Sequence, residues 1–420
     1  MSANGNLLVG QSGGCTAVIN ASLAGVVQKA LYDGRVGEIF GMRHGIEGLL
    51  LSDLVDLRME PEDMWRRLRR TPSAALGSGR YKLQEEDIGR IVARLRALDI
   101  RYFIYIGGND SADTAHRVSE AARREGYELH AVAVPKTIDN DLPYTDHCPG
   151  YGSIARFVST VTQEVGLDTE AMRRIDPVKI VEVMGRDAGW VAASAVLGKQ
   201  RDTDAPHLIY VPERPLSRER FLNDIKECHQ RHGYVVAVVT ETVRDESGGS
   251  IARTDPVFSH DPFGHRYLTG AASYLADLVA RELGLRARFD KPGTIQRMSM
   301  AMASEVDLQE AYEVGAHAVR VALNGEDDKM VTIERISNDP YTSRPGLVPL
   351  VEIANRQKLL PDEYINADGN HVTSTYLEYA LPLIGGEAVT YSHLRGKRPS
   401  GVAPSDERKR PALCPRPSGP

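Results

Sequence analysis

Residues 135–141 combine side chains that could carry out phosphoryl transfer. The stretch reads PKTIDND and places Lys136, Thr137, Asp139 and Asp141 close together in the chain. A carboxylate near a bound phosphate can accept a hydroxyl proton as general base, and a neighbouring lysine can neutralise charge on the group in transfer. The alternative is an Asx-rich turn, since Asn and Asp bond readily to nearby backbone. A solvated turn does not need the lysine, so the composition favours a catalytic loop.

Three further loops pair glycine with polar side chains. They are residues 10–16 (GQSGGCT), 107–111 (GGNDS) and 184–189 (MGRDAG). Glycine allows the backbone to approach an anion, and a helix N-terminus adds free N–H donors. The Asn and Asp of the second loop suit a phosphate or Mg²⁺, and Arg186 can bind phosphate oxygens in a fork. Together the loops indicate a site for phosphorylated ligands.

Each of these loops, taken alone, also has an ordinary explanation. The first could be a tight turn, and it matches neither the Walker pattern nor the full dinucleotide fingerprint. In the second, Asp110 or Ser111 could simply cap the next helix. In the third, Arg186 could pair with a surface carboxylate, which would contribute little. The four loops in one chain outweigh these separate alternatives.

The elements that must position these loops alternate along the chain. Short apolar runs rich in Val, Ile and Tyr predict strands at residues 7–9, 102–106, 129–134, 179–183, 207–211 and 234–239. Amphipathic stretches between them predict helices, for example with Ile88, Ile91, Val92 and Leu95 on one face. Alternating strands and helices predict an α/β fold with mainly parallel sheets covered on both faces. Ligands then gather beyond the carboxyl ends of the strands, where the four loops begin.

Composition excludes several other classes of protein. The chain has 420 residues, 42% of them hydrophobic, and a formal net charge of −6, which gives no basic field to attract nucleic acid. No apolar run is long enough to span a bilayer, and the N-terminal residues do not resemble a signal peptide. The four cysteines (Cys15, Cys148, Cys228 and Cys414) form no CxxC pair, so we expect reduced thiols and a cytoplasmic location. Residues 395–420, rich in Pro, Ser, Gly and basic side chains, are expected to be a disordered tail.

The ordered series GGND, PKTIDND, MGRDAG and GTIQR resembles the phosphofructokinase family, over roughly residues 6–323. The resemblance implies two doubly wound, mainly parallel lobes in a catalytic unit of residues 1–394. The donor lobe would be mainly 1–140 and the sugar-phosphate lobe mainly 141–300, with a helical closing segment at 301–394. It also implies a Mg²⁺-dependent transfer of a phosphoryl group to the 1-hydroxyl of fructose 6-phosphate.

The resemblance assigns expected roles residue by residue. Asp139 matches the general base, and Lys136, Asp110 and Arg186 would assist the reaction. The sugar phosphate would be bound by Thr137, Ile138, Asp139, Met184, Gly185, Arg186, Glu241, Arg288, Thr294 and Arg297. The donor phosphates would be bound by Gly13, Arg80 and Lys136, and the metal by Asn109, Asp110 and Asp141. Arg288 would come from a neighbouring subunit, which implies a homodimer or homotetramer.

Two positions indicate the phosphoryl donor. Members that use ATP resemble GGDGS and GTIDND, whereas here Asp110 and Lys136 stand where those members have glycine. A carboxylate at Asp110 would crowd and repel the α-phosphate of ATP, and the Lys136 ammonium could replace charge compensation lost with the nucleotide. Both changes resemble the pyrophosphate-dependent branch. The expected reaction is therefore reversible, giving fructose 1,6-bisphosphate and phosphate in glycolysis or gluconeogenesis.

Other features depart from the family pattern. Asn109 stands where an aspartate associated with the metal is usual, so the metal would rely on Asp110, Asp141 or the donor phosphates. Thr294 replaces a usual His or Tyr, which leaves a longer ketose such as sedoheptulose 7-phosphate open as acceptor.

Three other kinds of protein remain as alternatives. An ATP-dependent sugar kinase is disfavoured by Asp110 and Lys136, a non-catalytic regulatory subunit by Asp139 and Arg186, and a nucleotide-binding oxidoreductase by the lack of a full GxGxxG motif.

Overall fold

The computed structural model describes residues 5–252, 270–354 and 356–394. Residues 1–388 form one compact unit that contains every described helix and strand, and residues 389–420 form a second unit. The tail expected at residues 395–420 lies outside the described residues. None of the described helices is long and apolar enough to cross a membrane.

The first sheet has seven strands in the order β11-β10-β5-β4-β1-β2-β3. Its parallel centre consists of β2, β1, β4 and β5, and β10 joins β5 in parallel, while β3 and β11 pair antiparallel at the edges. The bounds are β1 (Gly5–Gln11), β2 (Val36–Met42), β3 (Leu54–Asp56), β4 (Ile100–Gly107), β5 (His130–Pro135), β10 (Lys329–Asn338) and β11 (Tyr341–Pro349).

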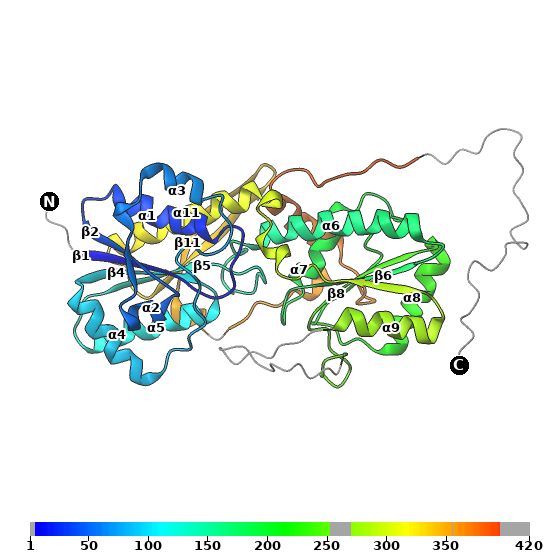
Figure 1. The fold of residues 1–420 in the computed structure, drawn as a ribbon, viewed down its shortest axis with the longest axis horizontal. Helices are drawn as coiled ribbons and strands as arrows, with labels where there is room; N and C mark the ends of the chain where they lie inside the picture. Colours follow the sequence, from blue (N-terminus) through cyan, green and yellow to red (C-terminus); the bar gives the residue numbers. More distant parts are fainter. Residues whose placement is uncertain (1–4, 253–269, 355, 395–420) are drawn as a thin grey trace, which may run out of the picture. The chain divides into compact units, whose positions relative to one another are not determined.

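Helices cover both faces of this sheet because the side chains of its central strands alternate between two apolar layers. Leu7 and Val9 of β1 pack in the layer with α1 (Ile19–Leu31), α3 (Glu62–Leu68) and α11 (Glu305–Leu323). Leu8 packs in the opposite layer with α2 (Ile46–Leu51), α4 (Glu85–Ala97) and α5 (Asn109–Arg124). Figure 1 shows these two groups of helices on either side of the sheet.

Helices α1 and α11 approach unusually closely at two glycines. A Cβ atom at Gly25 would lie 2.1 Å from the carbonyl oxygen of Tyr312, and one at Gly315 would lie 2.2 Å from that of Ser22. Any side chain at either position would push the two helices apart. This close packing fixes α1, and with it the glycine loop that precedes it.

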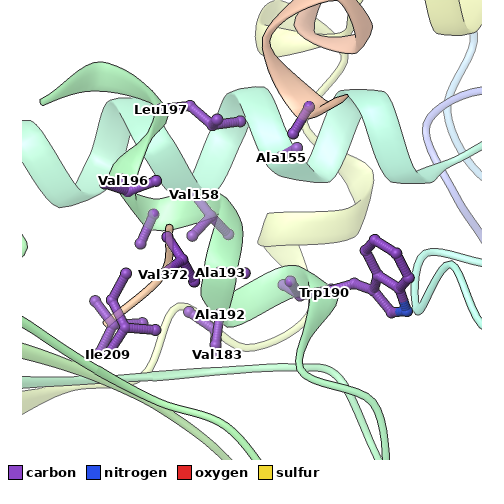
Figure 2. Close-up of a cluster of buried hydrophobic side chains, with 14 of the residues drawn as sticks. Ala155, Val158, Val183, Trp190, Ala192, Ala193, Val196, Leu197, Ile209 and Val372 are labelled. Carbon is purple, nitrogen blue, oxygen red and sulfur yellow. The ribbon is translucent and has the colours of Figure 1, made fainter. Parts of the chain in front are cut away.

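The second sheet has four parallel strands in the order β7-β8-β6-β9. Val181 and Val183 of β6 face α6 and α7, whereas Val178 and Ile180 face α8 and α9. Figure 1 shows both pairs of helices, and Figure 2 shows the first apolar layer, in which Val183 lies near Ala192, Ala193 and Val158. The bounds are β6 (Val178–Val183), β7 (Leu208–Tyr210), β8 (Val235–Thr240), β9 (Ala287–Asp290), α6 (Tyr151–Met172), α7 (Trp190–Ala193), α8 (Arg218–His232) and α9 (Ala271–Leu283). The α/β fold with two doubly wound sheets is confirmed.

The segment expected to be helical, residues 301–394, needs correction. It contains α11, but then the β10–β11 hairpin, which extends the first sheet instead of closing the molecule with helices. This hairpin was missed from the sequence because its only buried apolar run is residues 330–333, and the rest of both strands is partly exposed. The remaining short elements are α10 (Ile295–Met298), α12 (Ser374–Ala380), η1 (Leu57–Met59), η2 (Ser194–Gly198), η3 (Met300–Met302), η4 (Leu350–Glu352), η5 (Asp362–Tyr364) and η6 (Leu381–Ile384).

A buried histidine ties the hairpin to the loop after β5. His147 contacts Asp146 through Nδ1 at 2.8 Å and Glu310 of α11 through Nε2 at 2.7 Å. Arg335 of β10 also donates to Asp146, and Tyr341 of β11 donates to Glu310. Burial opposes the charged imidazole, but the two carboxylates prevail and raise the pKa of His147 to about 9.

We predict that this cluster makes stability depend on pH. Because the pKa of His147 is raised by folding, its stabilising contribution is complete below the unfolded pKa near 6.5 and is lost as pH rises through about 9. His147→Gln should lower the free energy of unfolding by about 3 kcal/mol at pH 6.5 and by less at pH 9.5. Urea unfolding of both proteins across this range measures the difference. A difference that is constant with pH would contradict the charged state of His147.

Candidate active site

The glycine loop after β1, the GGND loop after β4 and the PKTIDND loop after β5 begin side by side. Gln11 pairs with Ile106, and Gly107 pairs with Pro135, so the three strands end at the same edge of the sheet. The chain leaves β1 towards β2 on one side, while β4 and β5 lie on the other. The loops therefore meet where the winding of the sheet reverses, which is the usual ligand site of such folds.

Backbone contacts hold these loops against one another. Gly13, at a φ of +78°, donates its N–H to Gly79 at 3.2 Å. The N–H of Lys136 donates to Gly107 at 3.0 Å, and its ammonium reaches the carbonyl oxygen of Gly14 at 2.9 Å. Lys136 thereby joins the loops that follow β1, β4 and β5.

Lys136, Arg80 and Arg297 form a cluster of cations around the glycine loop. Lys136 is only 2% exposed, and burial, together with the charges of Arg297 and Arg80, lowers its pKa to about 8. Burial and Arg80 also lower the pKa of Arg297. The Arg297 Nε is buried and has no hydrogen-bond partner among the described residues, and a Cβ at Gly14 would lie 2.6 Å from its Nη1. The three cations repel one another, and the glycines beside them carry no side chains that cover the backbone. An anion bound there would relieve this repulsion, so the cluster is suited to bind an anion.

Asp139 lies next to this cluster in an environment suited to a general base. Burial, followed by the charge of the neighbouring Asp141, raises the pKa of its carboxyl group to about 7, against the lowering effect of Arg186 and Lys136. The backbone N–H of Asp139 donates a hydrogen bond to the hydroxyl oxygen of Thr137 at 3.1 Å. Asn140 adopts a positive φ of 54°, which turns the chain sharply between the two aspartates. A base with a pKa near 7 combines availability with proton affinity at neutral pH.

The second sheet contributes a set of charges to the same region. Val183 pairs with Thr240, and the N–H of Glu241 donates to the carbonyl oxygen of Val183 at 3.1 Å, so the loops after β6 and β8 lie together. Burial and the charge of Glu182 raise the pKa of Glu241 to about 6, against the lowering effect of Lys291, Arg186 and Arg297. Arg186 affects the pKa of both Asp139 and Glu241, and Arg297 affects that of both Lys136 and Glu241. The loops of the two sheets therefore contribute charges to one region.

The MGRDAG loop is shaped by glycine and by its neighbours. Gly185 has a φ of +128°, which residues with side chains rarely adopt. The N–H of Met184 donates to Gln296 Oε1 at 3.1 Å, and the hydroxyl of Thr242 donates to the carbonyl oxygen of Arg186. The motif GTIQR therefore supports the MGRDAG loop through Gln296 as well as supplying Arg297.

Asn109 and Asp110 lie in the first turn of α5, directly after β4. The N-cap position of this helix is Gly108, which has no side chain to cap it, so Asp110 is better described as an acid at the positive end of the helix. Asn109 donates its amide to the carbonyl oxygen of Arg356. Gly108 lies beside Lys136, since a Cβ there would be 3.6 Å from the Lys136 carbonyl oxygen. The start of α5, which carries Asp110, thus lies next to the loop that carries Lys136.

The described residues contain no group of three or more His, Cys, Asp or Glu side chains arranged to hold a metal ion. Mg²⁺ is commonly bound by one or two carboxylates together with substrate phosphates, so it does not require such a group. Asp139 and Asp141 are close enough for Asp141 to raise the pKa of Asp139. This pair of carboxylates beside an anion site fits a Mg²⁺ ion that arrives with a phosphorylated ligand.

One expected sugar-site residue does not join the cluster within one chain, and another does so only through its backbone. Arg288 pairs with Asp176 at 2.8 Å, near the amino end of β6, whereas Met184 follows its carboxyl end. Thr294 is exposed at the start of α10. Ile138 has its side chain in the apolar core beside Tyr151 and Trp190, so only its backbone faces the loop.

Sequence reasoning missed one charged pair near Glu241. Lys291 contacts Glu182 at 2.6 Å, and the other oxygen of Glu182 accepts from the N–H of Ala272 at the start of α9. Lys291 is the largest of the influences that lower the pKa of Glu241. This pair could have been expected from the sequence, because Glu182 is a charged residue within an apolar strand, and buried charges are rare without a partner.

Comparison with known proteins agrees with this geometry. Residues 6–322 match the family model described as phosphofructokinase. The chain is 42% identical, over 92% of its length and 93% of the relative's, to a pyrophosphate–fructose 6-phosphate 1-phosphotransferase of Halomonas elongata. It is 34% identical to a sulfofructose kinase of Alkalicoccus urumqiensis, over 85% and 91% of the two chains. Among solved structures, a pyrophosphate-dependent phosphofructokinase from Marinobacter aquaeolei is similar, with 40% identity, a TM-score of 0.83 and coverage of 91% and 92%.

We predict that the anion site can be closed by a single methyl group. At Gly13 a Cβ would lie 3.0 Å from the Lys136 ammonium, whereas at Gly126, which has a similar φ of +64°, nothing lies within 4 Å. Both Gly13→Ala and Gly126→Ala should cost about 1 kcal/mol of stability from the left-handed backbone. Only Gly13→Ala should weaken binding of pyrophosphate, by roughly tenfold (about 1.4 kcal/mol), in calorimetric titration. Equal affinities for the two variants would contradict an anion site at this loop.

Proposed function

Since the chain belongs to the phosphofructokinase family, we propose that it transfers a phosphoryl group from pyrophosphate to the 1-hydroxyl of fructose 6-phosphate, giving fructose 1,6-bisphosphate and phosphate. The observation that carries this proposal is the buried Lys136 ammonium, which lies between the glycine loop and Asp139. The names of the relatives from Halomonas elongata and Xanthomonas campestris support it, at 42% and 43% identity over 92% of the chain in each case.

In the proposed mechanism, Asp139 accepts the proton of the sugar 1-hydroxyl as the new O–P bond forms. The bond between the transferred phosphorus and the bridging oxygen of pyrophosphate breaks, and the second phosphate leaves. Arg186, which lowers the pKa of Asp139 and of Glu241, is placed to stabilise charge on the group in transfer. Lys136 would stabilise the leaving phosphate, and Gly13 and Arg80 would bind the donor around it.

Donor choice would depend on Asp110 and Lys136. A carboxylate at the start of α5 repels the additional phosphate that ATP would bring to this edge of the sheet. The Lys136 side chain fills the space beside Gly13 and Gly14, which a glycine at position 136 would leave open. Pyrophosphate, with two phosphates only, fits both constraints.

The sugar phosphate would be bound at the end formed by the second sheet. Glu241 would accept a hydrogen bond from a sugar hydroxyl, and Arg297 would bind the 6-phosphate. Backbone groups of Met184, Gly185 and Ile138 and the hydroxyls of Thr137 and Thr294 would complete the contacts. A relative named sulfofructose kinase, at 34% identity, indicates that the anionic end of the acceptor varies among similar chains, and sedoheptulose 7-phosphate remains an alternative acceptor.

Mg²⁺ would be held by the pyrophosphate oxygens together with Asp141, Asp110 or Asn109. It would supply neutralisation of phosphate charge when bound. The chain's own contribution is to keep Asp141 beside Asp139, where Gln357 also donates to Asp141 at 3.4 Å.

We further propose that the active form is a homodimer or homotetramer in which Arg288 reaches the sugar phosphate of a neighbouring copy. Arg288 is 56% exposed and points away from the site of its own chain through its pair with Asp176.

We also propose a cytoplasmic location. Three free thiols among the described residues, those of Cys15, Cys148 and Cys228, are in keeping with a reducing compartment.

The donor prediction tests the proposal directly. With fructose 6-phosphate and Mg²⁺, kcat/KM for pyrophosphate should exceed that for ATP by roughly a hundredfold or more. Asp110→Gly should admit ATP as a weak donor and reduce use of pyrophosphate, because it removes the charge that repels the α-phosphate. Coupled assays with both donors measure the ratio. Equal or better turnover with ATP by the natural protein would show that the donor assignment is wrong.

The general base can be tested through pH. We expect kcat/KM for pyrophosphate to rise through pH 7, as Asp139 loses its proton, and to fall above about pH 8, as Lys136 loses its charge. Asp139→Asn should lower kcat roughly 10²-fold or more while leaving substrate affinity largely unchanged. Lys136→Arg should move the alkaline limb to higher pH, because arginine keeps its charge. An unchanged alkaline limb in this variant would exclude Lys136 as its origin.

A further inference from the structure

Residues 356–360 lie beyond the part of the chain that the family model matches, residues 6–322. This short segment, which we call the strap, contains no helix or strand. It nevertheless contacts three loops of the candidate site. Arg356 accepts from Asn109 at the start of α5, and the N–H of Lys358 donates to the carbonyl oxygen of Asp141 at 2.7 Å.

Lys358 makes further contacts with the chain that follows Asp141. Its ammonium donates to the carbonyl oxygens of Thr145 at 3.0 Å and Asp146 at 2.9 Å. Neither contact is a surface ion pair, since both acceptors are backbone groups and burial lowers the pKa of the lysine. The strap therefore fixes the direction in which the chain leaves the PKTIDND loop.

The strap also reaches the MGRDAG loop, on the other side of the site. The indole N–H of Trp190 donates to the carbonyl oxygen of Lys358 at 3.1 Å, and the Lys358 ammonium lies 5.2 Å from the centre of the same ring. Figure 2 shows the ring of Trp190 pointing away from the alanine and valine side chains of the core, with its nitrogen at the outer edge. The ring thus joins the apolar core under α7 to the strap.

A second contact between the strap and this loop passes through Glu213. One oxygen of its carboxylate accepts both the N–H of Gly189 and the N–H of Leu360, each at 2.8 Å. The last glycine of MGRDAG and the end of the strap are therefore held on one buried acceptor. Burial raises the pKa of Glu213, against the lowering effect of these two N–H groups.

We propose that the strap sets the distance between Asp139 and Arg186, and that Lys358, Trp190 and Glu213 are positioning residues for the reaction. Lys358 is bonded on one side to Asp141, two residues after the base, and on the other to Trp190, four residues after the arginine. A loop that carries a general base and a loop that carries a phosphate-binding cation must keep a fixed spacing for in-line transfer. This inference rests on the proposed phosphoryl transfer.

The variant that tests it is Lys358→Met, which keeps the length and the apolar stem but removes the ammonium. Its matched control is Lys226→Met, the same change at an exposed position of α8. We expect kcat of Lys358→Met to fall roughly tenfold or more, with KM for both substrates within about threefold of the natural protein, because spacing and not binding is disturbed. Lys358→Arg, which can still donate to the two carbonyl oxygens, should restore most of kcat, and Lys226→Met should leave kcat unchanged.

Trp190→Phe provides an independent variant, since it removes the indole N–H but keeps an aromatic ring in the core. It should lower kcat by roughly threefold. The double variant with Lys358→Met should lose less than the product of the two single effects, because both changes loosen the same strap residue. Hydrogen–deuterium exchange of residues 137–146 and 184–190 should be faster in Lys358→Met than in Lys226→Met.

The outcomes separate this inference from the proposed function. If the natural protein does not turn over pyrophosphate and fructose 6-phosphate, the proposed function is wrong, while the exchange comparison still decides whether the strap holds the two loops. If Lys358→Met keeps natural kcat and natural exchange, the strap does not position the site. A fall in kcat that only follows the loss of folded protein, with no rescue by arginine, would likewise overturn the inference.

Discussion

The structure depends on holding Asp139 and Lys136 close together where water is largely excluded. Burial raises the pKa of Asp139 to about 7 and lowers that of Lys136 to about 8. Near neutral pH, Asp139 can therefore accept a proton while Lys136 still carries its positive charge. The electrostatic attraction between the two groups grows as the local dielectric constant falls. This attraction partly offsets the free-energy cost of desolvating both groups. Such a pair is stable only if the backbone around it is fixed, and the fold supplies that rigidity.

Three features of the fold keep the backbone around Asp139 and Lys136 rigid. The parallel strands β1, β4 and β5 end at one edge, so the loops that follow them share backbone hydrogen bonds. The close approach of α1 to α11 at Gly25 and Gly315 fixes the helix that follows the glycine loop. The His147 cluster holds the chain beyond Asp141 to α11 and to the β10–β11 hairpin. The proposed catalytic residues Lys136, Asp139 and Arg186 lie on loops, but each loop is anchored on rigid elements at both ends.

Much of this was accessible from sequence, for physical reasons. Apolar runs identified β1, β4 and β5 of the first sheet and β6, β7 and β8 of the second because these strands are almost fully buried, and the polar loops after them stood out by contrast. Strands β2 and β9 were missed because they are only partly buried. The charges that gather around Asp139 came from motifs in which glycine and charged residues are adjacent. The β10–β11 hairpin could not be found in the same way, since beyond the first half of β10 buried or partly buried residues alternate with exposed ones. The strap carries no motif, because its role depends on backbone groups and on a spacing of more than two hundred residues from Asp141.

The central claim is that the Asp139 carboxyl titrates near neutral pH because it is buried beside Asp141, with Lys136 and Arg186 limiting the shift. Infrared difference titration of the natural protein against Asp139→Asn isolates this one carboxyl group. We predict a band that titrates near pH 7 in the natural protein, is absent from the Asn variant, and moves to higher pH in Lys136→Met, where the nearby cation is gone. A carboxyl band at Asp139 that titrates near pH 4, unaffected by Lys136→Met, would contradict the account.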